Sequence, residues 1–166
     1  KAFTVFGIPA CMVAIRLLCS LITLADPNKK NIQEKVFRLI LWICPFVSIL
    51  LCVTTYPYAM GVEFNTTRIA TLFLGLLFLI IGNYLPKCKQ NYTVGIKLPW
   101  TLADTDNWER THRLAGRVWV PCGILIAGSS FLGDLGLPVI FICFAVMTLV
   151  PLVYSFLYYR QKNSGV

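Results

Sequence analysis

The sequence predicts an all-α protein, a polytopic bundle of transmembrane helices with an interfacial helix between the third and fourth spans. The 166 residues are 57% hydrophobic and only 13% charged, whereas soluble proteins carry about 25% charged residues. The apolar residues gather in five blocks of roughly 20 residues, the length that crosses a bilayer core of about 30 Å. Too little chain remains for a separate globular domain, so residues 1–166 are predicted to form a single membrane domain.

The first predicted span contains a charged residue, Arg16, near its middle. Because an arginine at that depth costs about 2.5–3.5 kcal/mol on insertion scales, we expect it to face protein or water. The alternative is that its side chain snorkels toward the cytoplasmic end. Asp26 lies about 15 Å farther along a helix, which is far for a side chain to reach, so the candidate partners are Glu63 and Asp134. The five predicted spans are 3–24, 36–56, 67–85, 114–132 and 138–158.

The other spans carry features typical of membrane helices. Pro45 and Pro57 are expected to kink the second span, and the third is an uninterrupted apolar run. In the fourth, small residues let helix backbones approach closely, and the short turn 133–137 pairs it with the fifth as an antiparallel hairpin. The fifth ends in an aromatic belt followed by Arg160. The small residues of the fourth span are Gly116, Gly123 and Gly128.

The basic residues predict the orientation. Twelve of the 15 Lys and Arg residues lie in or beside the loops 25–35 and 86–113 and the C-terminal tail. Since Lys and Arg collect on the cytoplasmic side, these segments are predicted to be cytoplasmic, and 57–66 and 133–137 to face outward. The formal charge of +8 is explained in the same way, so no direct binding of nucleic acid is predicted.

The start of the chain is unusual in two respects. It begins with Lys1 instead of Met, and five spans leave its two ends on opposite sides of the membrane. We expect a further helix before Lys1, which would give six spans in the complete protein. A cleaved signal peptide is the alternative.

The loop 86–113 differs from the rest of the chain in composition. Pro86 ends the third span, and Asn91, Gly95 and Pro99 mark turns. Thr101 is predicted to N-cap an interfacial helix that leads into the fourth span, with Asp104 three residues later. Its acidic residues come early and its arginines late, as the helix dipole favours. We expect Leu102, Trp108, His112 and Ala115 to form its inner stripe, and Trp100 and Trp108 to suit the headgroup level.

The same loop also contains residues that are typical of catalytic or metal sites. Glu109 and His112 have the i, i+3 spacing of carboxylate-bridged metal sites, but such sites need a second motif and the chain has one His. An acid/base pair of His112 with Asp104, Asp106 or Glu109 stays open. The sequence contains no nucleophile elbow, P-loop or HExxH motif. We therefore predict a protein that is not an enzyme and needs no metal or other cofactor.

The motif across residues 82–116 resembles the signature of the SdpI family. It runs Gly82-Asn83-Tyr84-Leu85-Pro86, then Asn91-Tyr92-x-x-Gly95-Ile96-Lys97-x-Pro99-Trp100-Thr101-Leu102, then Trp108-x-x-Thr111-His112-Arg113-x-x-Gly116. The family comprises bacterial integral membrane immunity proteins, commonly with six spans, named for one that protects a sporulating Bacillus cell against its own killing-factor peptide. In that founding member, the toxin-bound protein also captures a cytoplasmic autorepressor at the membrane.

The resemblance implies a multi-pass protein of the bacterial plasma membrane, with a cytoplasmic C-terminus, that gives resistance to a membrane-active toxin or bacteriocin-like peptide. The implied partners are membrane lipid, the toxin peptide and a cytoplasmic transcriptional repressor. The alternatives are a small transporter or channel, suggested by Arg16, Pro45 and Pro151, and a membrane-embedded enzyme. The expected functional residues are Gly82, Asn83, Tyr84, Pro86, Asn91, Gly95, Pro99, Trp100, Thr101, Trp108, Thr111, His112, Arg113 and Gly116, together with the intramembrane Arg16.

Overall fold

The computed structural model describes residues 6–62, 65–133 and 136–164, and every regular element within them is helical. Short 3-10 turns, η2 (Lys29–Asn31) and η3 (Leu85–Lys87), follow the first and third helices. The α-helices are α1 (Ile8–Leu24), α2 (Glu34–Ala59), α3 (Thr66–Tyr84), α4 (Pro99–Ala103), α5 (Thr105–Ser129) and α6 (Gly136–Asn163).

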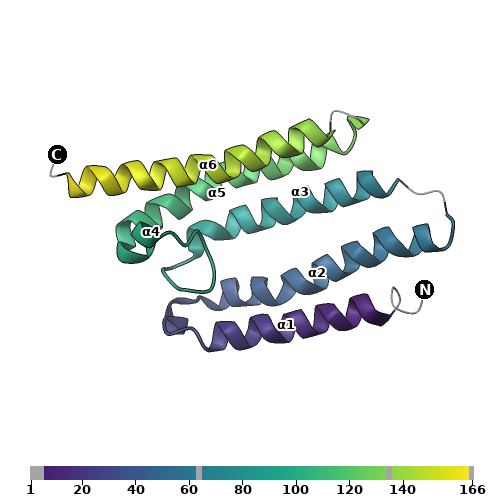
Figure 1. Cartoon of the computed structure of the whole chain (residues 1–166), viewed down its shortest axis with the longest axis horizontal. Helices are drawn as coiled ribbons and strands as arrows, with labels where there is room; N and C mark the ends of the chain where they lie inside the picture. The colour runs from purple at the N-terminus through teal and green to yellow at the C-terminus, as the bar shows by residue number, and fades with distance from the viewer. Residues whose placement is uncertain (1–5, 63–64, 134–135, 165–166) are drawn as a thin grey trace.

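The long helices run back and forth beside one another, and each packs on the next (Figure 1). The α1–α2 connection, α4 and the C-terminus lie at one end of the bundle, at the left of Figure 1. The α2–α3 and α5–α6 connections lie at the other end. The segments richest in Lys and Arg therefore share one end of the bundle, which is the arrangement that the charge pattern predicts.

Three helical stretches in the described residues are long and apolar enough to cross a membrane: Glu34–Pro57, Thr66–Lys87 and Gly136–Asn163. The apolar stretch Pro9–Leu24 of α1 is shorter. The helix α5 is long enough, but its first half carries charged residues, among them Asp106, Arg110 and Arg113. Three of the five predicted spans thus have matching apolar helices, and membrane crossing by α1 and α5 stays a prediction.

The helix that enters the fourth predicted span begins later than the sequence predicts. We expected Thr101 to be its N-cap, but Thr101 lies inside the short α4, and the chain is extended at Asp104 before α5 begins. The side chain of Asp104 accepts the backbone N–H of Asp106 at 3.1 Å and is the actual N-cap. The prediction was wrong because Asp104 was taken for the third residue of a longer helix, although Asp is itself a favoured N-cap.

The closest packing joins α3 and α5. A Cβ atom on Gly116 would lie 2.6 Å from Cγ of Pro86 and 2.8 Å from the carbonyl oxygen of Gly82, so only glycine permits this approach. Gly123 is equally close to α3, as predicted. The same prediction was wrong for Gly128, where an added Cβ atom would meet nothing within 4 Å.

The apolar core lies between α3, α5 and α6, with Ile126, Cys143 and Met147 fully or almost fully buried. At its edge, Phe78 makes an edge contact with Trp119, with ring centroids 5.5 Å apart. The indole Nε1 of Trp119 donates a hydrogen bond to the carbonyl oxygen of Met147 at 3.0 Å. This core holds α3, α5 and α6 together beneath the motif segment.

Candidate functional site

The centre of the motif segment is a fully buried pair of rings, Trp108 and His112. They lie one turn apart on α5 and stack, with centroids 4.1 Å apart and planes inclined by 22°. The His112 Nε2 atom accepts the backbone N–H of Ile96 at 2.9 Å. Nδ1 lies 2.8 Å from the carbonyl oxygen of Trp108 and therefore carries the proton in the neutral ring. Both ring nitrogens are thus used to attach the loop before α4 to α5.

Burial lowers the pKa of His112 to about 4, against the opposing effect of its hydrogen bond to Trp108. A ring that stays neutral at pH 7 satisfies both of its hydrogen bonds, whereas a protonated Nε2 could not accept from Ile96. The Trp108 ring is inside the protein, and its Nε1 donates to the carbonyl oxygen of Cys88 at 2.8 Å, while its level relative to the lipid headgroups stays a prediction.

Two turn residues shape the loop over this pair. The buried Asn91 side chain accepts the backbone N–H groups of Thr93 and Val94 at 2.9 and 2.7 Å and donates to the carbonyl oxygen of Lys89 at 2.7 Å. Gly95 has a φ of 124°, and a Cβ atom there would strike His112 and lie 2.8 Å from the Trp108 ring. The backbone can therefore cross the two rings closely only because residue 95 is glycine.

The short helix α4 is held through Thr101 and Gln90. The buried Thr101 hydroxyl accepts the Leu98 N–H at 2.9 Å and lies within donating distance of the Ile96 carbonyl oxygen, also at 2.9 Å. From the preceding loop, Nε2 of Gln90 donates to the carbonyl oxygens of Thr101 and Leu102 at 3.1 and 2.6 Å. The loop and α4 are thereby tied to each other.

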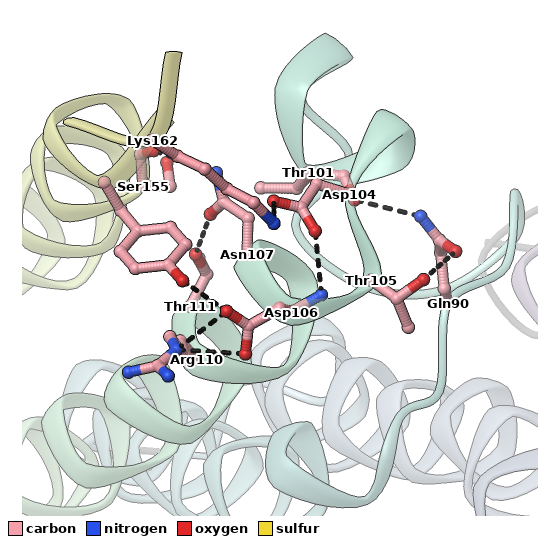
Figure 2. A network of polar contacts seen from close by, with 11 residues as sticks. Gln90, Thr101, Asp104, Thr105, Asp106, Asn107, Arg110, Thr111, Ser155 and Lys162 are labelled. Carbon is pink, nitrogen blue, oxygen red and sulfur yellow. Dashed lines mark hydrogen bonds and ion pairs between the residues drawn. The ribbon is translucent and has the colours of Figure 1, made fainter. Parts of the chain in front are cut away.

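A polar network connects α5 with α6 (Figure 2). The buried Thr111 hydroxyl donates to Asn107, whose side-chain amide donates to the Ser155 carbonyl oxygen at 3.1 Å. Nε1 of Trp100 donates to the Ser155 hydroxyl at 3.0 Å, so α4 reaches the same residue of α6. Three helices therefore meet at Ser155.

Charged residues form the rim of this network. The Asp106 carboxylate accepts a hydrogen bond from the Tyr158 hydroxyl and another from Nε of Arg110. These two contacts lower the pKa of its carboxyl group. Lys162 of α6 lies 2.7 Å from the Asp104 carboxylate and lowers its pKa in the same way (Figure 2). These contacts are solvent-exposed, so each contributes little to stability by itself.

The motif loop also contacts the first loop through Asp26, which is buried. Its carboxylate accepts the Tyr92 backbone N–H at 3.0 Å, the Thr93 hydroxyl, and the Asn28 N–H at 2.7 Å. Burial raises the pKa of Asp26, but these hydrogen bonds outweigh it and the pKa lies below the usual value. The two predicted cytoplasmic loops are therefore one connected structure.

The geometry separates His112 from Glu109, one of the three acids with which an acid/base pair stayed open. Glu109 is exposed and pairs with Arg113 at 2.8 Å, while His112 points the other way, into the protein. Within the described part of the chain, no three His, Cys, Asp or Glu side chains gather into a set that could hold a metal ion. The arrangement is suited to transmitting a change in helix packing, because polar contacts link its loops and helices.

The structure divides the predicted motif residues by exposure. Buried in the protein are Gly82, Asn91, Thr101, Trp108, Thr111, His112 and Gly116. Partly exposed are Tyr84, Gly95 and Trp100. The centroid of the Tyr84 ring lies 4.6 Å from Nζ of Lys87. Exposed are Asn83, Pro86, Pro99 and Arg113.

Arg16 lies far from this site. It is exposed and lines a groove of about 300 Å³ between α1 and α2, beside Cys44, Pro45 and Ser48. No ion pair to it is found within the described residues. The two carboxylates named as partners, Glu63 and Asp134, lie outside those residues.

Sequence reasoning missed Asp26, Gln90, Asn107 and Ser155 as parts of the site. Asn107 lies one helical turn before Thr111, and this spacing of two polar residues is a signal that could have identified it. Ser155 stands alone in an aromatic stretch, and nothing local marks it. Asp26 and Gln90 act through backbone atoms of other segments, which no sequence pattern records.

Comparison with known proteins agrees with the motif. Residues 87–155 match the model of the SdpI/YfhL protein family. Immunity protein SdpI from Bacillus subtilis (strain 168) is 29% identical over 170 aligned residues, which cover 99% of this chain and 79% of that relative. No solved structure matches the chain significantly. The two matches confirm the predicted resemblance to the SdpI family.

Proposed function

We propose that this protein is a multi-pass protein of the bacterial plasma membrane that protects the cell against a membrane-active toxin or bacteriocin-like peptide. The observation that carries the proposal is the near full-length similarity to an immunity protein, which includes the whole motif segment. The three long apolar helices support the membrane location. In this proposal α1 and α5 also cross the membrane, and α4 with the start of α5 lies at the cytoplasmic interface.

We further infer that the motif segment relays toxin binding to a cytoplasmic repressor. The relay is supported by the contacts that join α5, α6 and both basic loops, because a shift of one helix must change the loop that covers it. Asn83 is the exposed motif residue suited to contact a partner, since no described contact of its side chain explains its place in the motif. His112 would act by holding the loop before α4 on α5 and would not act as a catalyst.

The test is protection of a sensitive cell. The complete gene is expressed in a Bacillus strain that lacks its own immunity protein, and survival is measured after exposure to purified killing-factor peptide. We expect survival to rise at least tenfold over cells carrying an empty vector. Absence of protection at normal membrane abundance would contradict immunity to this peptide.

Variants then separate the surface from its support. Asn83→Ala is expected to lower protection or repressor capture while leaving membrane abundance and thermal stability unchanged, since the side chain is exposed. His112→Ala is expected to lower stability as well. Leu76→Ile, a volume-conserving change on the same helix as Asn83, is the matched control and should behave like wild type. If Asn83→Ala also retains full protection and full capture, the exposed surface of the motif is not part of the mechanism.

A further inference from the structure

Three arginines line one groove at the basic end of the bundle. Arg110, Arg113 and Arg117 follow one another along one face of α5, and the lining is completed by Asp106 and Leu114 of α5 and Tyr154 of α6. The groove has a volume of about 410 Å³. Arginine at such a surface suits phosphate, because the guanidinium group is planar and donates bidentate hydrogen bonds.

The three arginines differ in their partners. Arg110 is held by Asp106, and Arg113 by Glu109. No ion pair to Arg117 is found in residues 6–62, 65–133 and 136–164, and its side chain is exposed. Arg117 is also the deepest of the three along the helix toward the apolar half of α5. An arginine at the edge of the hydrocarbon region is stable only when it is hydrated or paired.

The face that carries the arginines becomes apolar immediately beyond Arg117. Ile124, two turns farther along α5, is 56% exposed, and Val150, one turn before Tyr154 on the antiparallel α6, is 39% exposed. Exposed apolar side chains of this kind are suited to contact the acyl chains of a lipid, while the arginines of the groove are suited to bind its headgroup. Charge and depth together therefore point to the headgroup of a lipid.

We propose that Arg117, with Arg113 and Arg110 beside it, binds the phosphate of an anionic phospholipid of the cytoplasmic leaflet. The guanidinium group of Arg117 pairs with the phosphate, and the acyl chains lie along the exposed apolar faces of α5 and α6. The proposal rests on the crossing of the membrane by α5. It does not depend on which toxin the protein resists, so failure of the protection assay leaves it standing.

Native mass spectrometry of the purified full chain tests the site, with phosphatidylglycerol and phosphatidylcholine of identical acyl chains as probes. Wild type is expected to retain the anionic lipid preferentially. Arg117→Gln is expected to lower the ratio of retained phosphatidylglycerol to phosphatidylcholine about tenfold, and Arg117→Lys to lower it less, because charge remains but the bidentate donor is lost. The matched control is Arg68→Gln, which removes an exposed arginine at the opposite end of the bundle, where it lies 4.4 Å from the Phe131 ring. That variant should keep the ratio within twofold of wild type.

Circular dichroism confirms that each variant is folded before its lipid is measured. Equal retention of the two lipids by wild type, or unchanged selectivity in Arg117→Gln, would overturn the proposal. Displacement of phosphatidylglycerol by an equal concentration of inorganic phosphate would identify a free-phosphate site, which also overturns the assignment to lipid.

Discussion

The imidazole ring of His112 stacks on the indole ring of Trp108, with ring centroids 4.1 Å apart, while its Nε2 atom accepts a hydrogen bond from the backbone N–H of Ile96. The chain's single histidine is therefore a connector between a loop and a helix, and its neutral form is required for that contact. The buried Thr101 is connected to the same pair through Ile96, whose N–H binds His112 and whose carbonyl oxygen lies 2.9 Å from the Thr101 hydroxyl.

The free energy of unfolding should fall as the pH is lowered from 6.5 toward 4, because the unfolded chain protonates His112 in this range and the folded protein does not. The pKa of His112 is about 4 in the folded protein, against an ordinary value of 6.5, so the unfolded chain binds more protons between these values. The contribution, about 3 kcal/mol at most, is complete above pH 6.5 and is lost as the pH falls toward 4. The melting temperature of the detergent-purified protein should drop over this range. His112→Gln should show a flatter pH profile, and an equally steep profile would assign the drop to other groups.

Gly95→Ala should destabilise the protein by roughly 1–3 kcal/mol, because the new methyl group overpacks against two fixed rings. Gly128→Ala is the matched control. It adds the same methyl group to a helix where nothing lies within 4 Å, and should stabilise by about 0.5–1 kcal/mol. Thermal melts of both variants measure the difference. Equal melting temperatures would mean that the loop does not cross the rings as described.

Asp26→Ala should loosen the contact between the two basic loops. The Tyr92 backbone N–H and the Thr93 hydroxyl lose their acceptor, at a cost of about 1–3 kcal/mol if they stay buried. Hydrogen exchange at the Tyr92 amide should become faster in Asp26→Ala. Glu34→Ala removes a carboxylate from an exposed pair with Arg38 and should leave this exchange unchanged. Slow exchange in both variants would show that the loop is held without Asp26.

Arg16→Leu should reduce protection more than Arg68→Leu. Arg16 lines the groove between α1 and α2 at the middle of a predicted span, whereas Arg68 lies near the start of α3. A charge retained at mid-span indicates a role that offsets its insertion cost, while one at the interface costs little. Survival at equal membrane abundance is the measurement. If both variants match wild type, Arg16 only snorkels.

The orientation is checked with single cysteines placed at Lys29 and Asn65 of a cysteine-free variant. Because basic loops stay in the cytoplasm, an impermeant thiol reagent applied to intact cells should label position 65 and leave position 29 unlabelled. Permeabilised cells, in which both positions should react, are the control for reactivity. Labelling of position 29 alone in intact cells would reverse the predicted topology.

The amino-acid sequence determined the helical character and the general organisation of this protein. Apolar blocks near 20 residues and clustered basic residues act locally, through the cost of placing charge in an apolar phase. The helices over 34–59, 66–84 and 136–163 follow directly from those blocks. Of the predicted inner stripe, Trp108, His112 and Ala115 follow from helical spacing and are fully buried, whereas Leu102 lies on the separate helix α4 and is partly exposed.

Only the tertiary structure decided what the motif residues contact. In a membrane chain, apolar spacing does not distinguish a face that meets lipid from one that meets protein, so the sequence assigned Trp108 both to the inner stripe and to the headgroup level, and only the structure shows that its ring is fully buried. The partners of the buried polar groups are mostly backbone atoms of distant segments, such as the Cys88 carbonyl for Trp108 and the Ile96 N–H for His112. Every residue carries those backbone groups, so the sequence contains no mark of which of them a side chain will bind. That choice is made only when the close approach of α3 and α5 brings the loop and the helix together.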